Sequence, residues 1–246
     1  MAYGEFANIY DKLIYEDIDY NLVSNRILEL CKEYQIQYED YLDLACGTGN
    51  VGVNVAKYFK NIYAVDLSED MLNIAFNKFK KNKIKAKIIC QDMCDLSLNH
   101  KFNLITSVLD STNYITDNED LIEYFKGVYD HLKEDGLFIF DINSYYKLSN
   151  ILGNNIYTYN SDEVFYTWEN VFEDEVLNMF LTFFVKDKNT SLYEKFEEEH
   201  IEKAYKEEYI EKALRQCGFK VIGKFEGYIN KDVDEKSERI VYVVSK

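Results

Sequence analysis

The sequence contains no proline and a single tryptophan. Without proline, the boundaries of helices and loops are marked by Gly, Asn and Asp. No uncharged apolar run approaches the length of a membrane span, and the first residues lack the basic and apolar segments of a signal peptide. These absences predict a cytoplasmic protein with no membrane partner.

Cysteines are few and lack the spacing of a metal site. The five of them are Cys31, Cys46, Cys90, Cys94 and Cys217. Their number is odd, no pair has C-x-x-C spacing, and no histidine is close enough to complete a zinc site with Cys90 and Cys94. We expect reduced thiols and no bound metal.

Positive charge is also scarce, with 28 Lys and Arg against 44 Asp and Glu and a net charge of -16. Proteins that bind a phosphate backbone carry clusters of Lys and Arg. The run Lys80-Lys81-Asn82-Lys83 is short and typical of a solvated helix end. Nucleic acid is therefore not the expected partner.

Strands and helices alternate through the middle of the chain. Apolar runs predict strands at 41–45, 62–65, 86–90, 103–107 and 137–141, and helices over 49–59, 69–81 and 119–132 separate most of them. A helix over 207–217, ended by Gly218, and strands over 219–226 and 239–244 follow. This order predicts an α/β, Rossmann-like sheet of seven strands, mostly parallel, with an antiparallel C-terminal strand.

A different pattern interrupts this order. From residue 156 to 199 apolar and polar residues alternate, and Asp174-Glu175 marks a turn between two such runs. The alternation predicts an inserted antiparallel β subdomain. We divide the chain into an N-terminal helical lid segment (1–40), the main domain (41–150 and 201–246) and the insertion (151–200).

The segment Gly47-Thr48-Gly49-Asn50-Val51-Gly52 fits the G-x-G-x-x-G pattern between a strand and a helix. Backbone N–H groups at such a turn suit a polar or anionic ligand group. With Asp66 ending the next strand, the pattern alone predicts an NAD-dependent oxidoreductase. Asp43, inside the strand, opposes this because a carboxylate repels a pyrophosphate and suits an amino group.

Two further motifs follow in order. Ala64-Val65-Asp66-Leu67-Ser68-Glu69-Asp70-Met71-Leu72 spans the second strand and the next helix start, and Gln91-Asp92-Met93 follows the third strand. With Asp43-Leu44-Ala45-Cys46-Gly47-Thr48-Gly49, they resemble the class I S-adenosylmethionine (AdoMet)-dependent methyltransferases. The resemblance spans residues 41–141 and, more weakly, 219–244.

The resemblance implies roles for these residues. The turn at Gly47 and Gly49 approaches the methionine part of AdoMet, Asp66 binds the ribose hydroxyls, and Asp92 binds the adenine amino group. The full set of cofactor residues that it implies is Asp43, Ala45, Cys46, Gly47, Gly49, Asp66, Leu67, Gln91, Asp92, Met93 and Leu109. For the carboxylates the structural alternative is a helix cap or a surface charge.

The N-terminal segment is rich in aromatic residues. Tyr10 and Tyr20, with Tyr3 and Phe6, resemble the segment that folds over AdoMet in small-molecule methyltransferases, where aromatic faces attract the sulfonium cation. The alternative is an amphipathic helix whose aromatic side chains belong to the core. Tyr10 and Tyr20 are therefore lid candidates.

Methyl transfer needs alignment above all. A neutral amine needs little further help, whereas an ammonium or a hydroxyl needs a base. His200 and Asp110, which follows the fourth strand, are the candidate catalytic residues, and the other candidates are Tyr157, Tyr159, Tyr166 and Tyr205. His131 is expected at the surface, at a helix end.

The insertion is expected to select the acceptor. Residues 161–203 carry 12 acidic residues against 4 Lys, which is typical of a solvated face and also favours a neutral or cationic substrate over a polyphosphate. Proteins similar to this one include amine and nucleotide-amino-sugar N-methyltransferases. We expect methylation of a small molecule at N or O, by a monomer or homodimer. An NAD enzyme, an AdoMet-binding regulator, a transferase using an AdoMet derivative and an RNA methyltransferase remain alternatives.

Overall fold

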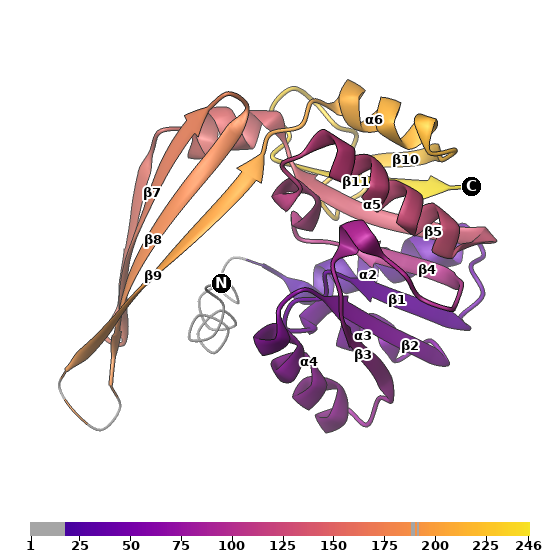
Figure 1. Cartoon of the computed structure of the whole chain (residues 1–246), viewed down its shortest axis with the longest axis horizontal. Coiled ribbons are helices and arrows are strands. Elements are labelled where there is room, and N and C mark those ends of the chain that lie inside the picture. The colour runs from indigo at the N-terminus through magenta and orange to yellow at the C-terminus, as the bar shows by residue number, and fades with distance from the viewer. Residues whose placement is uncertain (1–17, 188–189, 191) are drawn as a thin grey trace.

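The computed structural model describes residues 18–187, 190 and 192–246, which form two β-sheets and the helices around the larger sheet (Figure 1). The larger sheet contains β1 (Asp40–Leu44), β2 (Asn61–Asp66), β3 (Ala86–Cys90), β4 (Phe102–Ser107), β5 (Leu132–Asn143), β10 (Lys220–Glu226) and β11 (Arg239–Ser245). Their order is β10-β11-β5-β4-β1-β2-β3. β1 to β5 pair in parallel, and β11 is antiparallel to both β5 and β10. The predicted Rossmann-like sheet is confirmed.

Helices cover both faces of this sheet. They are α2 (Tyr20–Glu33), α3 (Asn50–Ala56), α4 (Glu69–Lys81), α5 (Asn118–His131) and α6 (Glu207–Gln216). One core packs α2, α3 and α4 against side chains such as Tyr41 and Leu104, and the other packs α5 and α6 against side chains such as Leu42 and Phe138. Tyr41 and Leu42 serve opposite faces because successive strand residues point to opposite sides.

Helix starts set the loops at the carboxyl ends of the strands. Ser68 caps α4 by accepting a hydrogen bond from the Met71 N–H at 3.3 Å, and acidic residues occupy the first turn. Asp117 caps α5 by accepting from the Glu119 N–H at 2.6 Å. Three short helical turns lie in other loops: η1 (Met93–Asp95), η2 (Ser111–Tyr114) and η3 (Lys147–Leu152). The loops that carry the predicted motifs are thus fixed by local hydrogen bonds.

The predicted antiparallel insertion is also confirmed. It consists of β6 (Ile156–Asn160), β7 (Val164–Glu173), β8 (Val176–Lys186) and β9 (Tyr193–Lys203), in the order β6-β7-β8-β9. Figure 1 shows this second sheet standing to one side of the larger one. Asp174 and Glu175, both with positive φ, form the β7–β8 turn predicted from the sequence. The residue limits proposed for the three parts of the chain stay a prediction.

His131 differs from its predicted surface position. It is 8% exposed, and its Nε2 accepts a hydrogen bond from the Leu98 N–H at 2.8 Å. Its Nδ1 lies 2.6 Å from the Gly127 carbonyl oxygen. The loop before β4 therefore folds back over the end of α5 and uses this imidazole to satisfy its backbone, which the charge of a helix end could not reveal.

Three further features concern thiols, metal sites and membrane spans. All five cysteines are free thiols. Within the described residues, no three or more His, Cys, Asp or Glu side chains are grouped in a way that could hold a metal ion. No helix in the described part of the chain is both long and apolar enough to cross a membrane.

Candidate functional site

The two glycines of the first motif have different structural roles. Gly47 and Gly49 both adopt positive φ, 52° and 78°, which favours glycine. A Cβ atom on Gly47 would meet no atom within 4 Å, so this part of the turn faces open space. A Cβ on Gly49 would lie 3.2 Å from the Ala75 Cβ, so the second glycine lets the turn pack closely against α4.

The turn does not offer its N–H groups to an anion as the motif suggested. The Gly47 N–H donates to Asp66 Oδ2 at 2.7 Å, and the Gly49 N–H donates to the Cys46 carbonyl at 2.9 Å. The Cys46 N–H donates to Val65 across the sheet. In addition, α3 is only seven residues long, shorter than the predicted helix over 49–59. A carboxylate already occupies the place where a pyrophosphate would bind, and this arrangement disfavours the NAD interpretation.

Asp66 is well placed for a ligand with hydroxyl groups. Its second oxygen accepts from the Ser68 N–H at 2.9 Å, and burial raises the pKa of its carboxyl. A carboxylate can accept about four hydrogen bonds, so both oxygens keep acceptor capacity for ribose hydroxyls. Leu67 beside it is 68% exposed and offers an apolar surface to a flat ring. These residues and the open space at Gly47 fit AdoMet.

Asp43 lies behind the turn. It is 2% exposed, and its Oδ1 accepts a hydrogen bond from Thr106 Oγ1 at 3.1 Å, while Oδ2 has no hydrogen-bond partner among the described residues. Burial, together with the charge of Asp66, raises the pKa of Asp43 to about 7. A Cβ on Gly52 would lie 2.1 Å from Asp43 Oδ2, so the third glycine of the motif makes room for this carboxyl. A direct contact between Asp43 and the cofactor stays a prediction.

The third motif follows β3. The Gln91 N–H donates to the Asp66 carbonyl at 3.0 Å, which ties the motif to the end of β2. Asp92 Oδ1 accepts from the Cys94 N–H at 2.8 Å and caps η1, so the structural alternative for this carboxylate is present. Met93 packs partly against the core. Binding of adenine by Asp92 and Met93 stays a prediction.

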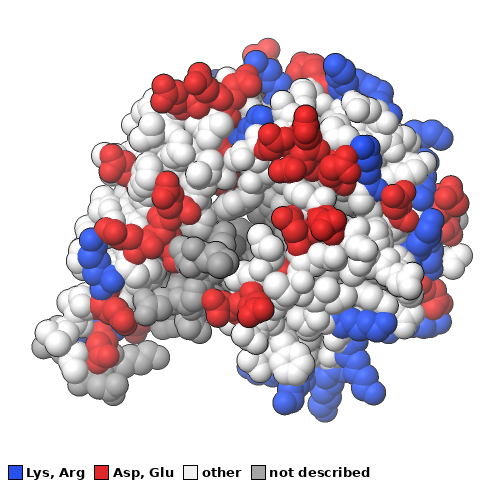
Figure 2. All heavy atoms as spheres, in the orientation of Figure 1, with Lys and Arg blue, Asp and Glu red and all other residues white. Residues whose placement is uncertain are grey.

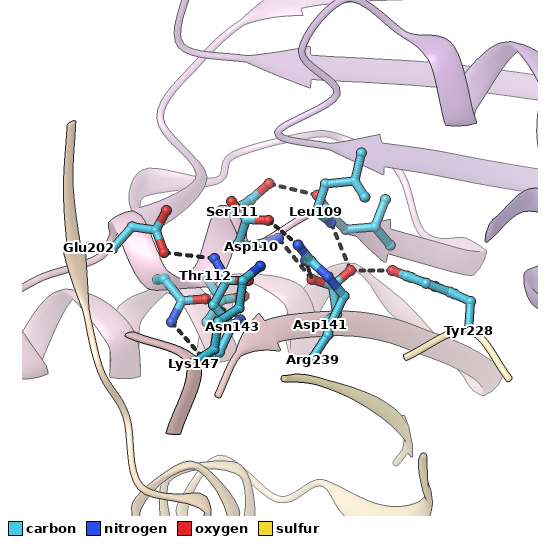
Figure 3. A network of polar contacts seen from close by, with 12 residues as sticks. Leu109, Asp110, Ser111, Thr112, Asp141, Asn143, Lys147, Glu202, Tyr228 and Arg239 are labelled. Carbon is cyan, nitrogen blue, oxygen red and sulfur yellow. Dashed lines mark hydrogen bonds and ion pairs between the residues drawn. The ribbon is translucent and has the colours of Figure 1, made fainter. Parts of the chain in front are cut away.

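The loop after β4 holds two residues in the left-handed conformation. Leu109 and Asp110 have φ of 61° and 59°, which costs an L residue about 1–2 kcal/mol each. Their N–H groups donate to the two oxygens of Asp141, at 2.7 and 2.8 Å (Figure 3). Asp141 is fully buried at the end of β5. These two hydrogen bonds to a buried carboxylate offset the backbone strain and fix the loop.

Arg239 completes this network. Its guanidinium pairs with Asp110 at 2.7 Å and with Asp141, and the Tyr228 hydroxyl donates to Asp141 (Figure 3). Burial penalises the guanidinium, but the charges of Asp141 and Asp110 raise the pKa of Arg239 overall. Asp110, predicted as a catalytic residue, is therefore one half of an ion pair. The geometry favours a role in holding the loop.

His200 faces the same loop from β9. Its Nδ1 lies 3.2 Å from the Tyr114 hydroxyl oxygen, and the two rings meet edge to face at 5.9 Å. The imidazole is 8% exposed; burial lowers its pKa, and the charge of Asp110 partly opposes this. The structure thus brings the two predicted catalytic residues, His200 and Asp110, into one electrostatic environment and favours a neutral imidazole at neutral pH.

Sequence reasoning missed the acidic group next to His200. Glu202 is 3% exposed and accepts a hydrogen bond from Asn143 Nδ2 at 2.9 Å. Burial and the charge of Asp110 raise the pKa of Glu202 to about 8. Lys147 donates to the Asn143 Oδ1 at 2.9 Å, so a cation lies close by (Figure 3).

The sequence carried signals for only part of this network. Asp141 ends an apolar strand at the carboxyl edge of the sheet, and Arg239 begins the apolar run of β11. A charged residue at either place indicates a buried partner. Glu202 carries no such signal, because its neighbourhood depends on how β9 is aligned with the ends of β4 and β5.

Several other candidates have structural roles. The hydroxyls of Tyr157 and Tyr205 donate to the carbonyls of Ile151, at 2.5 Å, and Ile115. Tyr20 is 5% exposed and belongs to an apolar core cluster, which favours the core alternative. Tyr10 lies outside the described residues.

Comparisons with known proteins agree with this geometry. The family described as "Methyltransferase domain" matches residues 42–136. The chain is similar to a putative methyltransferase of Geobacillus sp. (strain WCH70), with 32% identity and complete coverage of both chains. It is also similar to the crystal structure of an S-adenosylmethionine-dependent methyltransferase from Clostridium acetobutylicum ATCC 824, with 54% identity, a TM-score of 0.93, and coverage of 99% of this chain and 98% of the other.

A third relative is more distant. It is the dTDP-3-amino-3,4,6-trideoxy-alpha-D-glucopyranose N,N-dimethyltransferase of Streptomyces venezuelae, 30% identical over 137 residues. The match covers 55% of this chain and 56% of that protein, so it is confined to part of each.

Proposed function

The chain belongs to the S-adenosylmethionine-dependent methyltransferases, and from this premise we propose that it transfers the methyl group to a nitrogen of a small-molecule amine. The observation that carries the proposal is the buried imidazole of His200, whose Nδ1 lies 3.2 Å from the Tyr114 hydroxyl, where the second sheet comes against the loop after β4. The N,N-dimethyltransferase among the relatives is a further reason to favour nitrogen.

AdoMet supplies a methyl group activated by a positive sulfur. The residues of the larger sheet would hold it: Asp66 would accept hydrogen bonds from ribose hydroxyls, and the space at Gly47 would admit the methionine part. The Leu109–Asp110 loop, fixed by Asp141, would position the floor of the site. Fixing these groups in advance favours the in-line geometry on which methyl transfer depends.

His200 prepares the acceptor. A protonated amine has no lone pair for attack, so its proton must leave before the N–C bond forms. The imidazole, kept neutral by burial, accepts this proton. The lone pair of the amine would then form the N–C bond as the C–S bond of AdoMet breaks, and the electron pair of the broken C–S bond would stay on sulfur. Asp110 stabilises the resulting imidazolium by its charge.

The charge of the surface supports a small acceptor without phosphate. Figure 2 shows Asp and Glu side chains on the second sheet and on the part of the larger domain next to it, whereas most Lys and Arg side chains lie along the top, right and bottom of this view. A polyanion such as RNA would be repelled there. We infer that neither nucleic acid nor a polyphosphate is the acceptor.

The test uses AdoMet labelled with carbon-13 in its methyl group and a panel of amines, alcohols and an RNA. The chemical shift of the transferred carbon distinguishes N-methyl from O-methyl products. We expect N-methyl products, and an O-methyl or RNA product would refute the proposal.

Variants then test the base. In His200→Gln, kcat for a protonated amine should fall about 10²–10⁴-fold, the usual effect of removing a general base, while AdoMet affinity is unchanged. His100→Gln is the matched control, because His100 pairs with Asp40 at the amino ends of β1 and β4, whereas His200 lies near the carboxyl ends of the strands. An equal loss in both variants would exclude a specific role for His200.

A further inference from the structure

One face of the second sheet is defined by its contacts with the larger sheet. On β9, Glu202 contacts Asn143 and His200 contacts Tyr114, so the even-numbered residues of β9 face the ends of β4 and β5. Glu198 belongs to the same face because strand residues two apart point to the same side. We call this the inner face.

The strand register extends the inner face across the sheet. His200 lies opposite Met179, and Met179 lies opposite Asn170. One row further along, Glu198 lies opposite Leu181, and Leu181 lies opposite Trp168. Residues directly opposite one another in antiparallel strands share a face. In each row a residue of β9 and a residue of β7 that carry polar atoms flank an apolar residue of β8, and Trp168 in turn lies opposite Tyr157 on β6.

Three polar atoms on this face are buried without a partner among the described residues. They are Trp168 Nε1, Asn170 Oδ1 and Glu198 Oε2. Asn170 is 3% and Glu198 6% exposed. The Asn170 amide is held in place because its Nδ2 donates to the Asn155 carbonyl at 3.1 Å. A buried polar atom without a hydrogen bond costs free energy. Three such atoms on neighbouring rows indicate that a ligand supplies the missing hydrogen-bond partners.

The chemistry of the three atoms defines the ligand. Glu198 and Asn170 present oxygens, which accept hydrogen bonds from an ammonium group, and the aromatic face of Trp168 attracts a cation. The Trp168 N–H in turn needs an acceptor such as a hydroxyl oxygen. Neighbouring strands lie about 4.8 Å apart, so Trp168 and Glu198, two strands apart, are separated by roughly 10 Å at their backbones. A small molecule lying over Leu181 would span this separation.

The inner face also excludes one class of ligand. In β6–β9 the inner-facing residues include no Lys or Arg within the described part of the chain. A diphosphate placed on this face would meet Glu198 and no cation of the second sheet. A nucleotide-linked amino sugar is therefore not the acceptor that this face favours.

We propose that Trp168, Asn170 and Glu198 form a subsite for a hydroxylated alkylammonium group, and that the acceptor is an amino alcohol or amino sugar without a phosphate. The proposal rests on the proposed function, which places the acceptor between the two sheets. Glu198 neutralises the ammonium group, Asn170 accepts a second hydrogen bond from it, and Trp168 binds the hydroxyl oxygen and covers the cation.

The single tryptophan of the chain makes the subsite directly observable, because the indole N–H gives one resonance in a nitrogen-15 NMR spectrum. The protein is saturated with S-adenosylhomocysteine and titrated with ethanolamine, ethylene glycol or thymidine diphosphate. We expect ethanolamine to shift the Trp168 resonance in a saturable way, and the other two probes at the same concentrations to leave it unchanged.

Two variants give the control. Glu198→Gln keeps the shape of the side chain and should weaken ethanolamine binding about tenfold, the scale of one charge-assisted hydrogen bond. Glu199→Gln changes an exposed neighbour on the outer face and should leave the binding unchanged.

Three results would overturn the subsite. They are no shift with ethanolamine, an equal shift with thymidine diphosphate, or equal behaviour of the two variants. Because the readout requires no turnover, its failure is distinguishable from the detection of O-methyl products, which would instead refute the proposed function.

Discussion

The two sides of the site are built in different ways. On the cofactor side, the turn after β1 and the end of β2 are joined by backbone N–H groups that bind one carboxylate, Asp66. On the proposed acceptor side, the inner face of β6–β9 presents aromatic and acidic side chains, and the polar groups of the proposed subsite come from two strands, β7 and β9. The first construction depends on local chain geometry, and the second on long-range register.

The two sides also differ in their charged groups. Arg239 binds Asp110 and Asp141 and so holds the loop after β4. Its charge also acts on the buried carboxyl of Glu202. The loop that carries Asp110 therefore depends on one buried cation.

The largest expected effect comes from removing that cation. Arg239→Met leaves Asp141 fully buried without its counter-ion, and breaking a buried pair in this way costs about 3–5 kcal/mol. We expect the free energy of unfolding, measured with urea, to fall by this amount. Lys231→Met removes an exposed cation from a pair with Glu226 and should cost much less, because solvent screens a surface pair. Equal losses would show that the Arg239 network contributes no more than a surface pair.

The next effect concerns the cofactor side alone. Asp66→Ala removes the carboxylate that accepts from Gly47 and Ser68 and that we assign to the ribose. The variant also loses the two charge-assisted hydrogen bonds that we assign to the ribose hydroxyls. We expect this loss to weaken AdoMet binding by about 3 kcal/mol, or roughly a hundredfold. Isothermal titration measures it. Asp70→Ala, an exposed acid in the first turn of α4, is the control. Unchanged affinity in Asp66→Ala would reject the ribose assignment.

A third prediction concerns Gly52→Ala, which we expect to destabilise the protein although Gly-to-Ala changes in helices are usually stabilising. Replacing Gly by Ala inside a helix usually stabilises it by about 0.5–1 kcal/mol. In Gly52→Ala the new Cβ would lie 2.1 Å from Asp43 Oδ2, so we expect a loss of about 1–3 kcal/mol from overpacking. Thermal unfolding measures the sign. Gly127→Ala in α5, where the nearest atom would be 3.2 Å away, should be milder. A stabilised Gly52→Ala would contradict the position of Asp43.

The last effect concerns the proposed acceptor side and is measured through pH. Glu202 titrates near 4.5 when unfolded, but its folded pKa is raised to about 8. Between these values the folded state keeps a proton that the unfolded state has lost, so stability falls as pH rises, by at most about 1.4 kcal/mol per pH unit. In Glu202→Gln this contribution disappears. Urea unfolding at pH 5.5 and 7.5 measures it, and parallel pH curves for the two proteins would show that Glu202 is ionised in the fold.

The sequence predicted the cofactor side better than the acceptor side for a physical reason. The order of strands, the glycine turn and the Asp66 position follow from local patterns, since each lies within a few residues of a strand end. The glycine pattern alone predicts a turn whose N–H groups are open to an anion, and this prediction is wrong for Gly47. Its N–H donates to Asp66, which no local sequence pattern shows.

The acceptor side depends on contacts that are far apart in the chain. Asn143 and Glu202 are 59 residues apart, and Arg239 reaches Asp110 across 129 residues. Alternation in β9 predicted a strand, but only its alignment against β8 places Glu198 and His200 on the inner face. The polar residues of that face were therefore visible in the sequence while their grouping was not.

The points where the chain joins the second sheet have a consequence for diversification. The sheet begins soon after η3 and ends before α6, and Leu148, Leu152, Leu177 and Ala204 pack together at its base. Both junctions are thus held by one small apolar cluster, outside β1 to β5. We therefore expect the second sheet to be exchangeable as a unit. Another sheet with a matching base, introduced by evolution or by a protein engineer, would give a new acceptor specificity while the residues that bind the methyl donor stay unchanged.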